Sequence, residues 1–167
     1  DAVFFGTASE RNGPSAEARA LGPHGGGYGC LTSGTTGPEA LRLLTVSGAR
    51  ENARVHAASL GIGAASTLLQ ALPLHHSFGI VAYLFTALET GAALDLSPTL
   101  LTFRTLRKRA LEEAVLHVSP AQARFLLREG GAPPTGLSVL SVGGALLDPD
   151  ELERLRVLVP EARLYVT

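Results

Sequence analysis

The sequence predicts an α/β fold, a layered and mostly parallel β-sheet flanked by helices. Short apolar runs alternate with longer segments of helical periodicity over residues 28–167. Such alternation implies right-handed crossovers and parallel strands covered on both faces. With 167 residues, of which 46% are hydrophobic, the chain is long enough to bury a core of its own.

The predicted elements divide the chain into two parts. Residues 1–27 contain a short apolar strand at 2–5 and then a loop or linker rich in Gly, Pro, Ala and Ser. Residues 28–167 form one α/β subdomain. Its strands are predicted at 28–32, 41–46, 67–72, 92–96, 114–118, 137–142 and 163–167. Its helices are predicted at 48–61, 77–90, 101–112, 120–129 and 149–158.

Two of these helices carry explicit start signals. Ser119 precedes Pro120 and Gln122, a capping hydroxyl followed by proline at the first helical position and a glutamine that reaches back. Asp148 and Glu151 repeat this arrangement with carboxylates, which favour the positive end of a helix. These signals predict that the two helices begin at residues 120 and 149.

Composition excludes several classes of function. The net charge of −1, with both signs interspersed, argues against a nucleic-acid partner, and residues 104–109 are interpreted as a solvated basic helix face. No stretch is long and apolar enough for a membrane span, and no signal-peptide pattern is present. The single cysteine, Cys30, is expected to be an inert core thiol and fits a cytoplasmic location.

The chain is expected to be a piece of a longer protein. It contains no methionine, and its first residue is Asp1. Removal of an initiator methionine before such a residue would be unusual.

The most informative segment is a turn made only of small residues. It consists of Thr32, Ser33, Gly34, Thr35, Thr36 and Gly37. Glycines allow positive φ and close approach, successive N–H groups form an anion nest, and the hydroxyls add donors, which together favour phosphate binding. An ordinary surface loop is the alternative. The turn lacks the lysine of a P-loop, and the chain has no G-x-G-x-x-G that opens a helix.

Ligands of parallel sheets bind beyond the carboxyl ends of the strands. Three segments are predicted to lie there: the turn 32–37, residues 73–79 and residues 143–145. This shared position favours a binding site over unrelated loops.

In order along the chain, four segments resemble motifs of the adenylate-forming superfamily, which includes acyl-CoA synthetases, peptide-synthetase adenylation domains and luciferases. The turn 32–37 matches its Thr-Ser-Gly-Thr-Thr-Gly phosphate loop at every position. Residues 72–79 (LPLHHSFG) are similar to its Leu-Pro-Leu-Phe-His-x-x-Gly segment. Residues 115–120 (VLHVSP) resemble its Val-Leu-x-x-x-Pro junction, and residues 142–147 (VGGALL) its Ser-Gly-Gly-Ala-Pro-Leu segment.

The resemblance implies an enzyme that activates a carboxylic or amino acid with ATP and Mg²⁺, and then transfers the acyl group to coenzyme A or a carrier-protein pantetheine. Residues 32–37 would hold the β- and γ-phosphates, and Gly143, Gly144 and Ala145 would lie beneath the adenine. His76 would lie at the acyl pocket as the catalytic histidine, although a core or helix-capping histidine is the alternative. His75 is expected to pack, and no residue is assigned to a metal.

The chain also departs from the family pattern. The family continues this loop with x-Pro-Lys, but here Pro38, Glu39 and Ala40 follow the turn, and Glu39 or Ala40 takes the place of the lysine, depending on where one gap is put. A carboxylate there would repel phosphate. The chain stops before the family's Tyr-Gly-x-Thr-Glu segment, so by itself it is expected to be inactive. Two alternatives follow: a degenerate, non-catalytic scaffold or partner-binding module, and a stand-alone anion-binding α/β domain.

Overall fold

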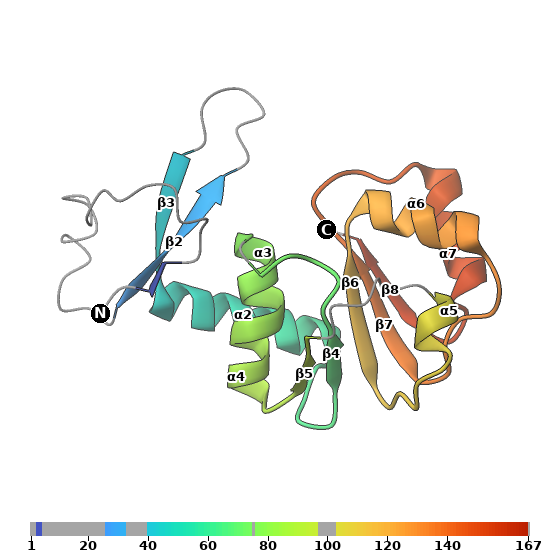
Figure 1. The fold of residues 1–167 in the computed structure, drawn as a ribbon, viewed down its shortest axis with the longest axis horizontal. Coiled ribbons are helices and arrows are strands. Elements are labelled where there is room, and N and C mark those ends of the chain that lie inside the picture. Colours follow the sequence, from blue (N-terminus) through green and yellow to red (C-terminus); the bar gives the residue numbers. More distant parts are fainter. Residues whose placement is uncertain (1–2, 5–25, 33–39, 75, 97–102, 167) are drawn as a thin grey trace.

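The strands form two separate sheets. The computed structural model describes residues 3–4, 26–32, 40–74, 76–96 and 103–166. Within these ranges, a three-stranded sheet has the order β1-β2-β3 and a five-stranded sheet the order β5-β4-β6-β7-β8 (Figure 1). The smaller sheet contains β1 (Val3–Phe4), β2 (Gly27–Thr32) and β3 (Ala40–Thr45). The larger contains β4 (Thr67–Leu69), β5 (Ala93–Asp95), β6 (Ala114–Val118), β7 (Leu137–Val142) and β8 (Arg163–Val166).

All neighbouring strands of the five-stranded sheet are parallel, which confirms the predicted fold class. The strand β6 is buried along its whole length. Its consecutive residues Val115 and Leu116 belong to different core clusters, so the sheet has a core on each face.

Helices cover both faces of this sheet. On one face lie α2 (Val46–Leu60) and a continuous helix made of α3 (Ser77–Gly79), η1 (Ile80–Phe85) and α4 (Thr86–Thr90). On the other lie α5 (Phe103–Leu106), α6 (Pro120–Glu129) and α7 (Pro149–Leu158). In Figure 1, α2 leads from the small sheet to the large one.

The placement of strand 28–32 corrects a prediction. We expected it in the parallel sheet, but β2 pairs antiparallel with β3, from Gly27 opposite Thr45 to Thr32 opposite Ala40. Residues 33–39 are too few for a parallel crossover, which needs a dozen or more residues, whereas antiparallel strands accept a short connection.

Three other predicted elements differ from the structure. The helix expected at 101–112 is only Phe103–Leu106 in the described part of that segment. The strand expected at 67–72 ends at Leu69, because side chains rather than a neighbouring strand bind the backbone of Ala71. The helix at 77–90 is confirmed, but its centre is a π-helix in which the N–H of Thr86 bonds to the carbonyl of Val81.

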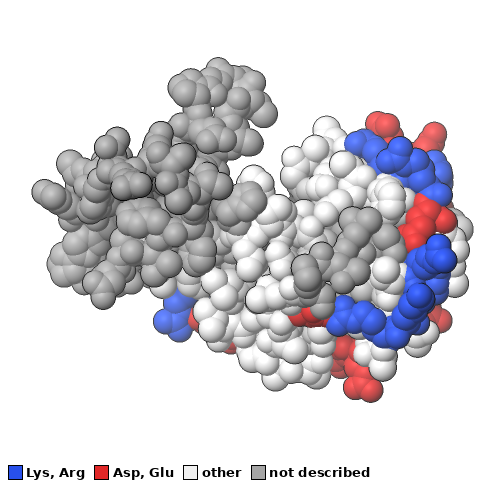
Figure 2. Space-filling view, viewed as in Figure 1, with Lys and Arg blue, Asp and Glu red and all other residues white. Residues whose placement is uncertain are grey.

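Charged side chains of both signs share the surface formed by α5, α6 and α7 (Figure 2). Arg109 forms an ion pair with Asp95, and Arg124 with Glu151. The basic segment 104–109 is therefore partly neutralised by neighbouring carboxylates. Among the residues that the structure describes, none of the helices combines the length and the hydrophobicity needed to cross a bilayer.

Candidate functional site

Three loops meet at the carboxyl end of the large sheet, after the adjacent strands β4, β6 and β7. The N–H of Gly143 donates to the carbonyl of Val118 over 3.1 Å, which joins the ends of β7 and β6. The side-chain amide of Gln122 donates to the carbonyl of Ala71 over 2.8 Å, which joins the loop after β4 to the start of α6. We call the described residues of these three loops, 70–74 and 76, 119–122 and 143–148, the rim.

Two of the predicted site segments lie on this rim. His76 is exposed and stands immediately before α3, without a capping hydrogen bond from its side chain. Gly143 is buried, whereas Gly144 and Ala145 are exposed. Gly144 has φ +100°, which favours glycine, and a Cβ added there would meet nothing within 4 Å. The rim is therefore open at Gly144, where a flat ligand could approach the backbone.

Contrary to our expectation, the strand that leads into the phosphate turn does not belong to the large sheet. Thr32 is the last residue of β2 in the smaller sheet. Ser33, Gly34, Thr35, Thr36 and Gly37 lie outside the described residues, as does His75. Their predicted contacts with phosphate stay predictions.

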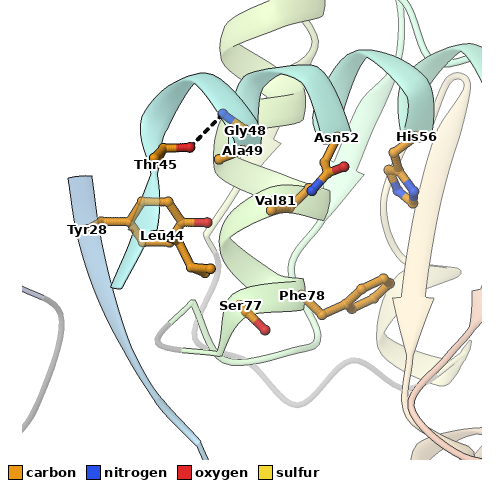
Figure 3. A pocket seen from close by; sticks show the side chains of 10 residues that line it. All are labelled: Tyr28, Leu44, Thr45, Gly48, Ala49, Asn52, His56, Ser77, Phe78 and Val81. Atoms are coloured by element: carbon orange, nitrogen blue, oxygen red, sulfur yellow. Dashed lines mark hydrogen bonds between the residues drawn. The ribbon is translucent and has the colours of Figure 1, made fainter. Parts of the chain in front are cut away.

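A pocket of about 430 Å³ lies between the small sheet and the helices α2, α3 and η1 (Figure 3). One of its lining residues is Ser77, which directly follows His76 in the chain. Its apolar lining includes Tyr28, Leu44, Phe78 and Val81, and its polar lining Thr45, Asn52, His56 and Ser77. The hydroxyl of Thr45 accepts a hydrogen bond from the N–H of Gly48 and caps α2. Asn52, His56, Ser77 and the hydroxyl of Tyr28 offer polar side-chain atoms to a ligand.

Two histidines stand side by side at this pocket: His56 lines it, and His117 is buried next to His56. The Nε2 atoms of His56 in α2 and His117 in β6 are 3.5 Å apart. The ring of Phe78 lies edge-on to both imidazoles, with centroid distances of 6.1 and 5.8 Å. Burial, and secondarily the charge of His56, lowers the pKa of His117 to about 3. Burial also lowers the pKa of His56, so both rings are neutral at pH 7.

Two buried polar atoms next to this pair have no hydrogen-bond partner within the described ranges. They are Nδ1 of His117 and Oγ of Ser141, on residues that are register partners in β6 and β7. Both side chains are at most 1% exposed. Each unpaired buried atom of this kind destabilises the fold by about 1–3 kcal/mol. Folded proteins contain few such atoms, and functional sites are among the places where they occur.

Sequence reasoning did not identify His56, His117 or Ser141. A single histidine or serine in an apolar strand has no local signal, and the three residues come from different elements. Within the parts of the chain that the structure covers, no three His, Cys, Asp or Glu side chains gather as metal ligands.

Several solved structures are similar to this chain. VinN in complex with L-aspartate is 22% identical, with a TM-score of 0.69 over 82% of this chain and 35% of the other. MbtA from Mycobacterium smegmatis, in its apo form, is 26% identical, with a TM-score of 0.65 over 79% and 25%. The O-succinylbenzoate coenzyme A synthetase MenE from Bacillus subtilis, in complex with ATP and a magnesium ion, is 25% identical, with a TM-score of 0.66 over 78% and 28%.

The chain thus spans about a third or less of the length of these proteins. The comparison with curated protein sequences found no match. The sequence model of the family described as AMP-binding enzyme matches residues 7–167, nearly the whole chain. This chain therefore belongs to the AMP-binding enzyme family.

Proposed function

We propose that the chain is part of an ATP-dependent ligase that activates a carboxylic or amino acid as its acyl-adenylate and then transfers the acyl group to a thiol. The observation that carries this proposal is the family match over residues 7–167, because it includes the phosphate turn, His76 and the Gly143–Ala145 segment in one alignment. The open rim at the end of the parallel sheet supports it, since ligands of such sheets bind there.

Each predicted site residue has a role in this proposal. Thr32, Ser33, Gly34, Thr35, Thr36 and Gly37 hold the β- and γ-phosphates through backbone N–H groups and hydroxyls. The backbone of Gly143, Gly144 and Ala145, exposed at Gly144 and Ala145, supports the adenine, where a larger side chain would block the base. Mg²⁺ accompanies the triphosphate, and no residue of this chain is assigned to it.

In the first step, a carboxylate oxygen of the acid forms a bond to the α-phosphorus of ATP, and the bond to the departing pyrophosphate breaks. His76 orients the attacking carboxylate, and the phosphate turn fixes the leaving group, so that much of the entropy cost of in-line attack is removed on binding. In the second step, a thiol attacks the acyl carbon and AMP leaves.

The acyl portion of the substrate occupies the pocket between the small sheet and the helices α2, α3 and η1, which Ser77 helps to line. Phe78 and Val81 give this pocket apolar contact area, and Asn52 and His56 give it hydrogen-bonding groups. Because His56 is neutral at pH 7, its ring can accept or donate a hydrogen bond without requiring a charged substrate.

The acceptor is proposed to be coenzyme A or a carrier-protein pantetheine, and the location cytoplasmic, where ATP and free thiols are abundant. MenE is named as a coenzyme A synthetase. VinN was crystallised with L-aspartate, an amino acid. These neighbours support the reaction class without selecting a substrate for this chain.

ATP–pyrophosphate exchange by the full-length protein, measured with a panel of carboxylic and amino acids, tests the proposal. We expect magnesium-dependent exchange with at least one acid and a large loss of that exchange in His76→Ala. No exchange with any acid, from protein that is folded by circular dichroism, would overturn it.

A second candidate is a non-catalytic scaffold that keeps the fold. The observation that favours it is Glu39, near the position where the family has a lysine. Calorimetric titration with ATP and with a non-hydrolysable acyl-adenylate mimic separates the two candidates. Tight binding of the mimic supports the ligase, and no binding of either ligand supports the scaffold. The variant Glu39→Lys should strengthen ATP binding only if the turn 32–37 holds phosphate.

A further inference from the structure

The backbone of Ala71 is held by two side chains that approach from different helices. Its N–H donates to the hydroxyl of Tyr83 over 3.1 Å, and its carbonyl accepts from the side-chain amide of Gln122 over 2.8 Å. Tyr83 lies in η1 on one face of the sheet, and Gln122 in α6 on the other. Ala71 follows the end of β4, where a further strand residue would have bonded to a neighbouring strand.

Tyr83 is fully buried and binds two elements with one oxygen. Besides accepting from Ala71, its hydroxyl donates to the carbonyl of His117 in β6 over 2.9 Å. Burial raises the pKa of Tyr83 to about 12, so the hydroxyl keeps its proton and remains a donor at physiological pH. A single phenol therefore fixes the loop after β4 to the end of the central strand.

Gln122 is oriented by the cap of its own helix. Its Oε1 accepts from the N–H of Ser119 over 2.8 Å, so its Nε2 is directed to the carbonyl of Ala71. The same side chain completes a capping box and binds the loop. The start of α6 and the loop after β4 are therefore fixed together.

Hydrogen bonds within the loop also fix the described residues that follow Ala71. The side chain of Gln70 donates to the carbonyl of Leu72, and the N–H of His76 donates to the carbonyl of Pro73. Gly79 packs so closely on this carbonyl that an added Cβ would lie 2.2 Å from its oxygen. The position of Ala71 is thus transmitted through Pro73 to His76 and the start of α3.

We propose that Tyr83 and Gln122 form a two-sided clamp on Ala71 that positions His76 for the adenylation step. They are positioning residues, because they act through the loop and touch no reacting atom. This inference rests on the proposed ligase function for its effect on catalysis, but its effect on the loop is independent of that function. No local pattern in the sequence connects Ala71, Tyr83 and Gln122.

The test compares four variants of the full-length protein. Tyr83→Phe removes the hydroxyl alone. Gln122→Glu keeps the acceptor that caps α6 but replaces the donor to Ala71 with an oxygen, and Gln122→Met removes both interactions. Tyr165→Phe is the matched control, because its hydroxyl also donates to a backbone carbonyl, that of Ser59, which belongs to none of the rim loops.

Amide hydrogen exchange of the peptide that covers residues 70–76 is the first readout. We expect exchange there to accelerate roughly tenfold in Tyr83→Phe and Gln122→Glu, with no change in Tyr165→Phe. Peptides of α6 should change in Gln122→Met but not in Gln122→Glu. Unchanged exchange at 70–76 in both Tyr83→Phe and Gln122→Glu would overturn the clamp, whatever the activity.

Pyrophosphate exchange is the second readout. We expect kcat to fall roughly tenfold in Tyr83→Phe while KM for ATP stays within about twofold, because His76 orients the acid and not the nucleotide. If the loss of any such tyrosine hydroxyl lowered activity by destabilising the fold, Tyr165→Phe would also contain less active enzyme. A mobile loop with unchanged kcat would overturn the positioning role. If the wild-type protein exchanges with no acid, the ligase proposal fails, and the loop exchange alone decides the clamp.

Discussion

His117 shows how one buried residue makes the stability of the protein depend on pH. Its pKa is lowered from 6.5 to about 3 in the folded chain, chiefly by burial. Between these values the unfolded chain binds a proton that the folded chain does not, so stability is complete above about pH 6.5 and falls as the pH is lowered.

We predict that the free energy of unfolding falls by about 2 kcal/mol from pH 7 to pH 5 because of His117. Urea denaturation at several pH values measures this slope. In His117→Gln, which cannot be charged, the slope should become shallower by that amount. Equal slopes in the two proteins would show that His117 is not the group responsible.

Gly79 and Gly63 offer a matched pair of glycines. A Cβ at Gly79 would lie 2.2 Å from the backbone oxygen of Pro73, whereas one at Gly63 would meet nothing within 4 Å. We predict that Gly79→Ala destabilises the chain by about 1–3 kcal/mol despite the better helix propensity of alanine, because the obstructing atom is backbone. Gly63→Ala should change stability by at most about 0.5 kcal/mol. Thermal unfolding of both variants checks the difference.

At the residue scale, sequence reasoning proposed those parts of the candidate site that have a local signal. The turn 32–37 and the pair Gly143 and Gly144 consist of residue types that are informative by themselves. His56 and His117 are informative only as a pair, and 61 positions separate them in the chain. Contacts of this kind arise from the packing of α2 on β6, which no local pattern encodes.

The helix α6 begins with a capping box, and this box supports a prediction at the element scale. The hydroxyl of Ser119 accepts from the N–H of Gln122, and Oε1 of Gln122 accepts from the N–H of Ser119. Ser119→Ala should lower the free energy of unfolding by about 1 kcal/mol, because an N–H of the first turn loses its partner. Denaturant titration measures the loss, with the exposed Ser47 in α2 as the control site. A loss of the same size in Ser47→Ala would mean that the cap contributes nothing specific.

Elements with such end signals were predicted with correct bounds. The helices α6 and α7 agree with the predicted 120–129 and 149–158, because caps at Ser119 and Asp148 are local interactions. The helix α5 was predicted too long, since the buried Leu106 and Leu111 fit a helical period although the chain turns between them. The pairing of β2 with β3 was missed because the strand pattern does not specify which sheet a strand joins.

At the scale of the whole molecule, stability should be graded across the large sheet. The strand β6 lies between β4 and β7 and is buried at every residue, whereas β8 is an edge strand in the described structure and only partly buried. We predict that amides of β6 exchange with solvent more slowly than those of β8, because edge strands open through local fluctuations. Hydrogen exchange followed by mass spectrometry measures this order. Equal rates would mean that the sheet opens only as one unit.

The strand order β5-β4-β6-β7-β8 also has a consequence for synthesis on the ribosome. Once β4 and β5 have paired, β6 adds beside β4, β7 beside β6 and β8 beside β7, so each strand that emerges finds its neighbour already made. The larger sheet can therefore grow in one direction during translation, and no strand has to be inserted between two that are already joined.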